Sequence, residues 1–485
     1  MREKLAQALD YISDEKIADA AAPRKGKKRI LFRAIAAVLA VVIFLNLPFI
    51  PGKVNASEIA LASGTRKPDR PQRDDYEIWE DFRADLDIYD ARLAKQRKDA
   101  ITAFENLKPF LIKSGEAYVN GSEENRVWSP INSYIALAAL SEITAGNSRQ
   151  QILDALNVSD LETLRTQVGA VWEEIYYNYE EEFNEVSLLA NSLWLNEGLN
   201  YNRQTMEDIA HYHYASVYQT DLASESASRA LRTWLDNNTG GLLSDKVGSA
   251  SFPPEAVLTL ASTVFLQSKW VDEFNAAKNT IDPFHTPDGD VNATFMNQKE
   301  MQTYYYWGED FGAVFLHLKN GCKMWFILPD EDKTVMDVLN DSAYLDILMP
   351  WSVYSDEEPE NCKYMKVNLS VPKFDVASSA NFASVLQQVG ITDVFDPEKS
   401  DFTAITAAEK DSFAPPVTLT GVNQAARVII DEQGVKAASY LEFPGAGAAM
   451  PPEEIIDFVL DRPFVFVIAD TNTGIPLFTG VVNEP

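Results

Sequence analysis

A segment near the carboxyl end of the chain has the features of both a strand and a loop. Residues 424–434 read QAARVIIDEQG, a strand followed by an acidic turn, and residues 435–450 continue as VKAASYLEFPGAGAAM. Every second residue from Val435 is small or apolar, while the residues between them carry both charges and the tyrosine. This alternation is typical of a strand that buries one face. The segment nevertheless ends in Pro444 and glycines among alanines, which favours an exposed, protease-accessible loop. On the alternation alone, an edge hairpin is an equal alternative.

Residues 34–50 read AIAAVLAVVIFLNLPFI, a run of 17 residues without a charge. A membrane-spanning helix needs roughly 17–25 residues. The basic cluster between residues 24 and 33 predicts a cytoplasmic tail over 1–33 and an extracellular location for 51–485. The alternative is a cleavable signal peptide, because Val54-Asn55-Ala56 resembles a cleavage site. More than 20 residues precede the basic cluster, which favours a retained single-pass anchor. Both interpretations place 57–485 outside the cytoplasm.

The chain is strongly acidic, with a formal net charge of −30. This charge repels phosphate backbones and argues against nucleic acid as a partner. Apolar residues make up 46% of the chain, enough for a large buried core.

The two cysteines, Cys322 and Cys362, are far apart in a chain too long to depend on a disulfide framework. We expect two buried free thiols, with a single bridge as the alternative. His211 and His213 stand two residues apart, but they are expected to be ordinary core or surface residues and not metal ligands. We predict no metal and no cofactor.

Strands and helices mix between residues 100 and 485 without βαβ regularity, which predicts an α+β fold in one large domain. The segment 51–99 is rich in charged residues and is predicted to be a stalk or an early charged helix. Ser148, with Gln151 three residues on, is predicted to cap a helix as a capping box. Buried strands are predicted at 188–195, 256–266 and 322–329, and helices at 133–143 and 148–156.

No catalytic motif is present in the sequence. It contains no H-E-x-x-H, no G-x-S-x-G, no phosphate loop and no G-x-G-x-x-G, and only four histidines. We therefore expect a protein that is not an enzyme.

Seven motifs in unbroken order over roughly 100–485 resemble the serpin family of serine protease inhibitors. The family hinge runs glutamate, any residue, glycine, a small residue or threonine, and then an alanine-rich stretch, which matches EQGVKAAS at 432–439. The other motifs are WSPINSYIALAAL from Trp128, GNSRQQILDAL from Gly146, SKWVDEFNAAKNTIDPFHTPDG at 268–289, VPKFDV at 371–376, LQQVGITDVFDPEKSDFTAI at 386–405 and DRPFVFVIADTNTGIPLFTGVVNEP at 461–485. With the predicted anchor, the chain resembles a bacterial, membrane-anchored member of the family.

The resemblance implies a serpin domain over 100–485 with mixed sheets, helices and an exposed reactive loop. The hinge then consists of Glu432, Gly434, Val435, Ala437, Ala438 and Ser439. Counting Glu432 as the first residue, the family's spacing puts the scissile bond between the seventeenth and eighteenth, Ala448 and Ala449, and Met450 is the second choice.

A polar cluster under the family's central sheet usually holds Ser, Asn and His. Here its positions fall on Asn132, Ser262 and Gln424, so the serine and asparagine are exchanged and glutamine replaces histidine. Pro444 also departs from a ladder-forming strand because it lacks an N–H group.

The resemblance implies a suicide-type inhibitor, and in such proteins the cleaved loop inserts as a new strand. An alanine before the bond predicts elastase-like or subtilisin-like target proteases. We expect a monomer whose partners are serine proteases and, through 34–50, the membrane. The alternative is a non-inhibitory serpin that acts as a binding or adhesion module.

Overall fold

The computed structural model describes most of the chain from residue 71 onwards. The described residues are 57–60, 71–178, 186–198, 200–239, 241, 248, 250–253, 256–350, 359–406, 417–419, 422–435 and 454–485. None of the helices in this part of the chain is both long and apolar enough to cross a bilayer, and the predicted anchor at 34–50 lies outside it.

The chain divides into a small unit that includes residues 71–89 and a large unit that includes residues 90–485. Helix α4 (Trp79–Val119) runs through the point of division and also through the predicted boundary at residue 100. In the small unit, the short helix η1 (Arg73–Asp75) precedes α4, and the Tyr76 hydroxyl donates to Asp85 at 2.8 Å. The charged helix that the sequence offered as one reading of this segment is therefore present from residue 79.

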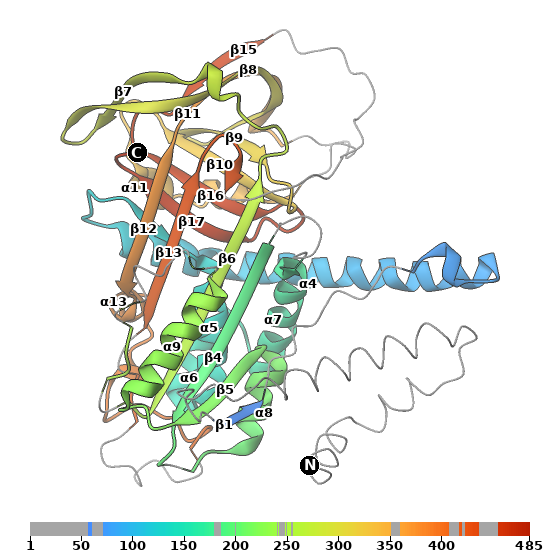
Figure 1. Ribbon diagram of the computed structural model, residues 1–485, viewed down its shortest axis with the longest axis vertical. Coiled ribbons are helices and arrows are strands. Elements are labelled where there is room, and N and C mark those ends of the chain that lie inside the picture. The colour runs from blue at the N-terminus through green and yellow to red at the C-terminus, as the bar shows by residue number, and fades with distance from the viewer. Residues whose placement is uncertain are drawn as a thin grey trace. The chain divides into compact units, whose positions relative to one another are not determined.

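One part of the large unit is a six-stranded sheet in the order β1-β5-β4-β6-β14, with β3 also paired to β4. β4 and β6 are antiparallel from Val186–Gln267 to Leu195–Leu258, and β5 runs parallel to β4. Figure 1 shows β4 and β6 as long strands that lie side by side, with α9 in front of them. The strands are β1 (Ser57–Ala60), β3 (Tyr177–Asn178), β4 (Val186–Asn196), β5 (Ala215–Thr220), β6 (Leu258–Lys269) and β14 (Gly434–Val435).

Two further strands, β12 (Phe374–Asn381) and β13 (Asn423–Ile430), form a separate antiparallel ribbon. β13 lies beside β6 and contacts it (Figure 1). Among the described residues, however, the edge of β6 that faces away from β4 forms ladder pairs only with Gly434 and Val435. We call the rest of this edge, residues 258–267, the open edge of β6.

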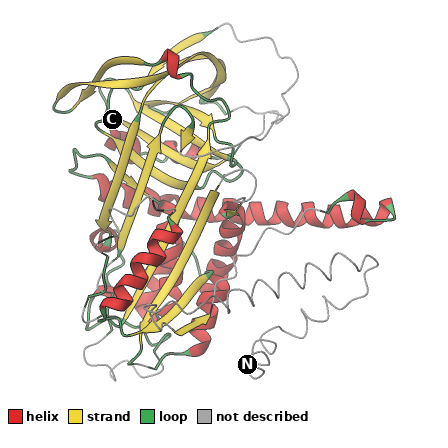
Figure 2. Cartoon of the chain, viewed as in Figure 1, coloured by secondary structure: helices red, strands yellow, loops and turns green. Residues whose placement is uncertain are grey.

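A nine-stranded sheet makes up the other end of the large unit, where strands cross in front of one another in Figure 2. All seven residues of β16 and all seven of β17 are buried, so these two strands are covered on both faces. Its strands are β2 (Arg126–Trp128), β7 (Thr280–Thr286), β8 (Gly289–Trp307), β9 (Phe311–His317), β10 (Cys322–Pro329), β11 (Cys362–Pro372), β15 (Ile455–Val459), β16 (Phe464–Asp470) and β17 (Pro476–Val482).

The predicted strands at 188–195 and 322–329 are confirmed as the buried strands β4 and β10. The strand predicted at 256–266 is also present, as β6, but most of its side chains are only partly buried. Residues 258–267 of this strand make no ladder pairs with the described residues on the edge that faces away from β4.

Helix α5 (Pro130–Ile143) confirms the helix predicted at 133–143 and starts at Ser129, whose hydroxyl accepts from the amide of Asn132. The capping box at Ser148 and Gln151 was wrong, because α6 begins two residues earlier and Ser148 is buried inside it. Both side chains instead accept backbone amides from the segment 392–401. The other helices are α6 (Gly146–Ala155), α7 (Leu161–Ile175), α8 (Arg203–Tyr212), α9 (Glu225–Asn238), η2 (Ala276–Lys278), α11 (Val335–Leu339), α12 (Ala343–Asp346), α13 (Ala383–Gln388) and η3 (Asp393–Phe395).

Candidate functional site

The predicted hinge begins in a tight turn at the end of β13. Asp431 and Gly434 exchange backbone hydrogen bonds, and the Asp431 carboxylate accepts the Gln433 amide at 2.8 Å. The fully buried Trp270 donates two hydrogen bonds to this turn. Its backbone amide donates to the Gln433 carbonyl at 3.0 Å, and its indole N–H donates to the Asp431 carbonyl at 2.8 Å. The chain therefore leaves β13 from a fixed point.

Gly434 occupies a position that only glycine fits. Its φ of +148° is strained for other residues, and an added Cβ would lie 2.4 Å from the Cα of Lys269. This close approach brings Gly434 and Val435 into antiparallel register with Lys269 and Ser268 of β6. Val435 is buried, with 5% of its surface exposed. The first inserting position of the predicted hinge is therefore already a strand residue.

Glu432 anchors the same turn electrostatically. Its carboxylate accepts from Lys373 and from the Asn279 amide, both at 2.6 Å. The hydrogen bond from Lys373 lowers the pKa of Glu432 below its usual value, although partial burial opposes the shift. Glu432 is therefore held as a carboxylate that ties β13 to two other segments of the large unit.

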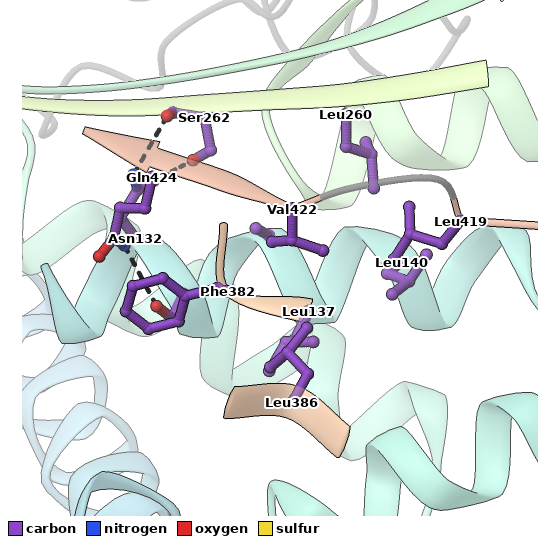
Figure 3. A pocket seen from close by; sticks show the side chains of 12 residues that line it. Asn132, Leu137, Leu140, Leu260, Ser262, Phe382, Leu386, Leu419, Val422 and Gln424 are labelled. Carbon is purple, nitrogen blue, oxygen red and sulfur yellow. Dashed lines mark hydrogen bonds between the residues drawn. The ribbon is translucent and has the colours of Figure 1, made fainter. Parts of the chain in front are cut away.

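A cavity of about 50 Å³ lies where the open edge of β6, β13 and helix α5 meet (Figure 3). We call it the β6–β13 cavity. Figure 3 shows mainly apolar side chains at one end and a polar group at the other. Its lining residues are Asn132, Ser133, Ala136, Leu137, Leu140, Leu260, Ser262, Phe382, Leu386, Leu419, Val422 and Gln424.

Asn132 and Ser262, two of the three predicted cluster residues, bond directly to each other. The Ser262 hydroxyl hydrogen-bonds to the Asn132 side-chain carbonyl, and the Asn132 amide donates to the Ser262 backbone carbonyl at 3.1 Å. Asn132 comes from α5 and Ser262 from β6, so this pair ties the helix to the strand that has the open edge.

Gln424, the third predicted cluster residue, is bonded to the start of α5 instead. Its amide donates to the Ser129 carbonyl at 3.0 Å and to the Ser133 hydroxyl at 3.2 Å, and its carbonyl accepts the Ser129 amide at 3.2 Å. The structure thus brings the three residues around one cavity, with β6 and β13 each fastened separately to α5. β6 and β13 are therefore held by separate attachments to the same helix.

The sequence did not identify Asn191 of β4, which extends the cluster. Its side-chain carbonyl lies 2.6 Å from the Ser262 hydroxyl, and its amide donates to the backbone carbonyl of His213 at 2.9 Å. This contact depends on the register of β4 with β6, which pairs Asn191 with Ser262. Seventy residues of intervening chain leave no spacing signal for it.

Behind Asn191 lies a buried ion-pair group. Glu142 at the end of α5 accepts from Arg165 at 2.5 Å and contacts His213 Nε2 at 3.1 Å. Burial alone would raise the pKa of Glu142, but the bonds from His213 and Arg165 outweigh it and lower the pKa to about 2. His213 is therefore a fully buried partner of a carboxylate.

The remaining predicted hinge residues, Ala437, Ala438 and Ser439, lie outside the described residues, as do Ala448, Ala449 and Met450. Their assignments stay predictions. Among the described residues no cluster of histidine, cysteine or carboxylate side chains is arranged to hold a metal ion. Cys322 and Cys362 are buried free thiols, which confirms the favoured prediction.

The family model described as serpin, serine protease inhibitor, matches residues 111–485. The chain belongs to the serpin family. Curated relatives include an alpha-1-antiproteinase of Callosciurus caniceps, 28% identical over 366 residues that cover 74% of this chain and 83% of the relative. The human leukocyte elastase inhibitor is 24% identical, with 76% of this chain and 94% of the relative covered.

Among solved structures, the native state of the thermophilic serpin tengpin is similar to this chain. The TM-score is 0.66 at 24% identity, and 79% of this chain and 94% of that chain are covered. At that identity the likeness shows the fold alone. The named relatives are protease inhibitors by their descriptions, and the sequence prediction of a serpin is confirmed at the level of family and fold.

Proposed function

We propose that this serpin is a suicide-type inhibitor of serine proteases that traps the acyl-enzyme by inserting its cleaved loop into the six-stranded sheet. The observation that carries the proposal is the open edge of β6, which starts beside the hinge residues Gly434 and Val435. The part of the loop before the proposed bond, residues 436–448, is long enough to lie along that edge. Its 13 residues extend to about 43 Å at about 3.3 Å per residue, whereas residues 258–267 span about 33 Å.

In this mechanism the protease supplies the nucleophile and the inhibitor supplies a substrate loop and a place for it to go. The Ala448–Ala449 bond is attacked, and an acyl-enzyme forms on Ala448. The freed loop then pairs along the open edge of β6. About ten new backbone hydrogen bonds at about 1 kcal/mol each give roughly 10 kcal/mol, which is sufficient to drag and distort the attached protease.

The proposed targets are elastase-like or subtilisin-like proteases, because alanine at the bond fits a shallow primary pocket. The direct test is incubation of the protein with pancreatic elastase, followed by a denaturing gel. A band at the summed mass, less the released peptide, supports trapping. Complete cleavage with active protease and no such band would show that the protein is a substrate and not an inhibitor.

The hinge is tested by two neighbouring substitutions of equal chemistry. Val435 is buried, and the alternation puts Ala437 on the same face and Ala438 on the opposite face. Ala437→Arg should place a charge inside the sheet and slow insertion, so that cleaved inhibitor releases active protease. Ala438→Arg is the matched control and should still trap elastase. If both variants trap elastase equally well, the assignment of Ala437 to the inserting face of the hinge is wrong.

The bait is tested separately by Ala448→Arg. This change leaves the hinge intact and alters only the fit to the protease pocket, so the preference should move from elastase to trypsin with trapping retained. If elastase is still trapped as well as before, the scissile bond lies elsewhere, and Met450 is the next position to substitute.

We also propose that residues 34–50 form a retained anchor with the inhibitor outside the cytoplasm, on the strength of the uncharged run and the basic cluster before it. The intact protein should fractionate with membranes and be open to added protease on whole cells. Recovery of a soluble protein that starts at Ser57 would establish signal-peptide cleavage instead. The comparisons do not test a bacterial source, which stays a prediction.

Pro444 favours a second candidate function, a non-inhibitory serpin that acts as a binding module. A proline cannot donate to a ladder, so it interrupts pairing deep in the sheet. Pro444→Ala separates the two functions. An inhibitor limited by this residue should trap elastase more efficiently after the change, whereas a binding module should form no stable complex with either residue.

A further inference from the structure

Lys323 of strand β10 is a partly exposed lysine whose amine lies against aromatic rings. Its Nζ is 4.3 Å from the ring centroid of Phe315 and 5.8 Å from that of Trp325. In the part of the chain that the structure describes, this Nζ forms no hydrogen bond and no ion pair. Lys363 and Lys366 of the same sheet, in contrast, are both paired with glutamates. The Lys323 amine is therefore held by rings and not by an anion.

The register of the sheet explains why no anion accompanies Lys323. Lys323 stands opposite His317 of β9 on one side and Ala469 of β16 on the other. Side chains alternate along a strand, so the pairs formed by Trp325, two residues further on, share the face of Lys323. The neighbours on that face are aromatic, aliphatic or imidazole side chains, namely Phe315, His317, Trp325, Val467 and Ala469. None of these five side chains is a carboxylate.

The acidic side chains of the neighbouring elements are engaged elsewhere. Asp470 of β16 belongs to the opposite face, and its carboxylate accepts the amide and the hydroxyl of Thr473 at 2.8 and 2.7 Å. Asp337 of α11, which packs on β10, accepts the amide and the hydroxyl of Thr334. Desolvation of the amine lowers the pKa of Lys323 to about 8, and Asp470 opposes this shift only in part. At pH 7 about a tenth of the Lys323 amines are then uncharged, against roughly four in ten thousand for a lysine of ordinary pKa.

We propose that Lys323 is a covalent binding site for aromatic aldehydes, which its ε-amine captures as an imine. A lysine amine that is desolvated beside apolar groups is an activated nucleophile, and the ring of an aromatic ligand would stack on Phe315 and Trp325. The Nζ lone pair attacks the carbonyl carbon, the two amine protons leave with the carbonyl oxygen as water, and a C=N bond replaces the C=O bond. The reaction needs no oxidant and no reductant. It does not depend on protease trapping, because Lys323 lies outside the hinge and the loop.

Reductive labelling tests the proposal by comparing Lys323 with another lysine of the same sheet. Lys363 of β11 is the internal control, because its side chain is 52% exposed but bonded to Glu454 at 2.7 Å. The full chain in detergent micelles is treated at pH 7 with benzaldehyde and cyanoborohydride, and the benzylated peptides are quantified by mass spectrometry. Lys323 should be labelled at least about tenfold faster than Lys363. Equal or faster labelling of the more exposed Lys363 would overturn the proposal.

Two substitutions opposite Lys323 test whether the missing anion activates the amine. His317 is exposed, so the fold should accept a change there. His317→Asp sets a carboxylate opposite Lys323 and should slow its labelling at least about fivefold at pH 7, because an anion favours the charged amine. His317→Asn is the matched neutral control and should stay within about twofold of the natural chain. If the two variants are labelled at the same rate, the proposed cause of the reactivity is wrong.

The aromatic class of the ligand is tested by changing the aldehyde. The ratio of Lys323 to Lys363 labelling removes the intrinsic reactivity of each reagent from the comparison. This ratio should be at least about threefold larger for benzaldehyde than for cyclohexanecarbaldehyde, because only the benzaldehyde ring is aromatic and stacks on Phe315 and Trp325. Equal ratios for the two aldehydes would overturn the assignment to aromatic ligands.

Discussion

The two main sheets of this serpin differ in how completely they are filled. In the nine-stranded sheet, β16 is paired on both edges and all seven of its side chains are buried. In the six-stranded sheet, the described residues pair with β6 along one edge but on the other edge only at Gly434 and Val435, and most side chains of β6 are partly exposed. Both edges of β16 are thus occupied by neighbouring strands, whereas most of one edge of β6 makes no ladder pairs with the described residues. The comparison separates a stable scaffold from the part of the fold that can still gain pairs.

The largest expected effect comes from filling the open edge. Under the proposed mechanism, a clean cut within residues 444–450 should raise the unfolding temperature on the order of tens of degrees, because roughly 10 kcal/mol of new pairing is added. Differential scanning calorimetry of intact and cut protein measures the change. Superimposable melting curves would show that the cut loop adds no pairs to the open edge of β6, and the insertion mechanism would be wrong.

Core truncation should distinguish the sheets next. Phe466 of β16 is fully buried, and the centroid of its ring lies 5.1 Å from that of Phe374. Phe466→Ala should therefore cost about 3–5 kcal/mol of unfolding free energy. Leu260 of β6 lines the β6–β13 cavity and is partly exposed, so Leu260→Ala should cost less than about 2 kcal/mol. Urea titrations followed by two probes give both values. Equal losses would contradict the difference in packing.

Acid should weaken the attachment of α5 through Glu142. Its pKa is lowered from 4.5 to about 2 in the folded protein, so its contribution is present above about pH 4.5 and is lost as the pH falls toward 2. That contribution is roughly 3 kcal/mol. Glu142→Gln should therefore lower stability at pH 7 and flatten the dependence between pH 4.5 and 2. An unchanged acid transition in the variant would assign acid sensitivity to other carboxylates.

The smallest effect is expected at the polar cluster. Ser262→Ala removes the hydroxyl that binds Asn132 and Asn191 and should cost about 1–2 kcal/mol in the intact protein. Ser226→Ala, at an exposed position of α9, is the control and should stay within about 0.5 kcal/mol. If the two serines cost the same, the cluster does not hold β6 to α5.

The sequence predicted the family and the main strands because these depend on local pattern and on motif order. It missed Asn191 and the Glu142–His213 contact because these depend on strand register and on how a helix end meets a distant turn. The capping box failed for a related reason. Ser148 and Gln151 fit a local motif, but the amides of Asp401, Thr392 and Asp393 are their partners in the fold.

The open edge of β6 is also invisible in sequence. The segment 256–266 is apolar enough to predict full burial, and nothing in it reports a missing neighbour. That neighbour, in the proposed mechanism, is a segment about 170 residues later that is a loop in one state and a strand in another. An interpretation of the alternating pattern that assigns one conformation to the segment cannot describe both its loop state and its strand state.

The close approach of Gly434 to Lys269 has a consequence for how the segment after Val435 aligns with β6. A strand that slips by one residue turns every side chain to the opposite face. For the segment after Val435, such a slip would bury Lys436, Tyr440 and Glu442 in place of Ala437, Ser439 and Leu441. A one-residue slip would place either Gln433 or Val435 against Lys269, where a Cβ at the position of Gly434 would lie 2.4 Å from the Lys269 Cα, so the glycine favours the observed alignment. In the proposed mechanism, Gly434 would therefore set which face of the inserted loop is buried.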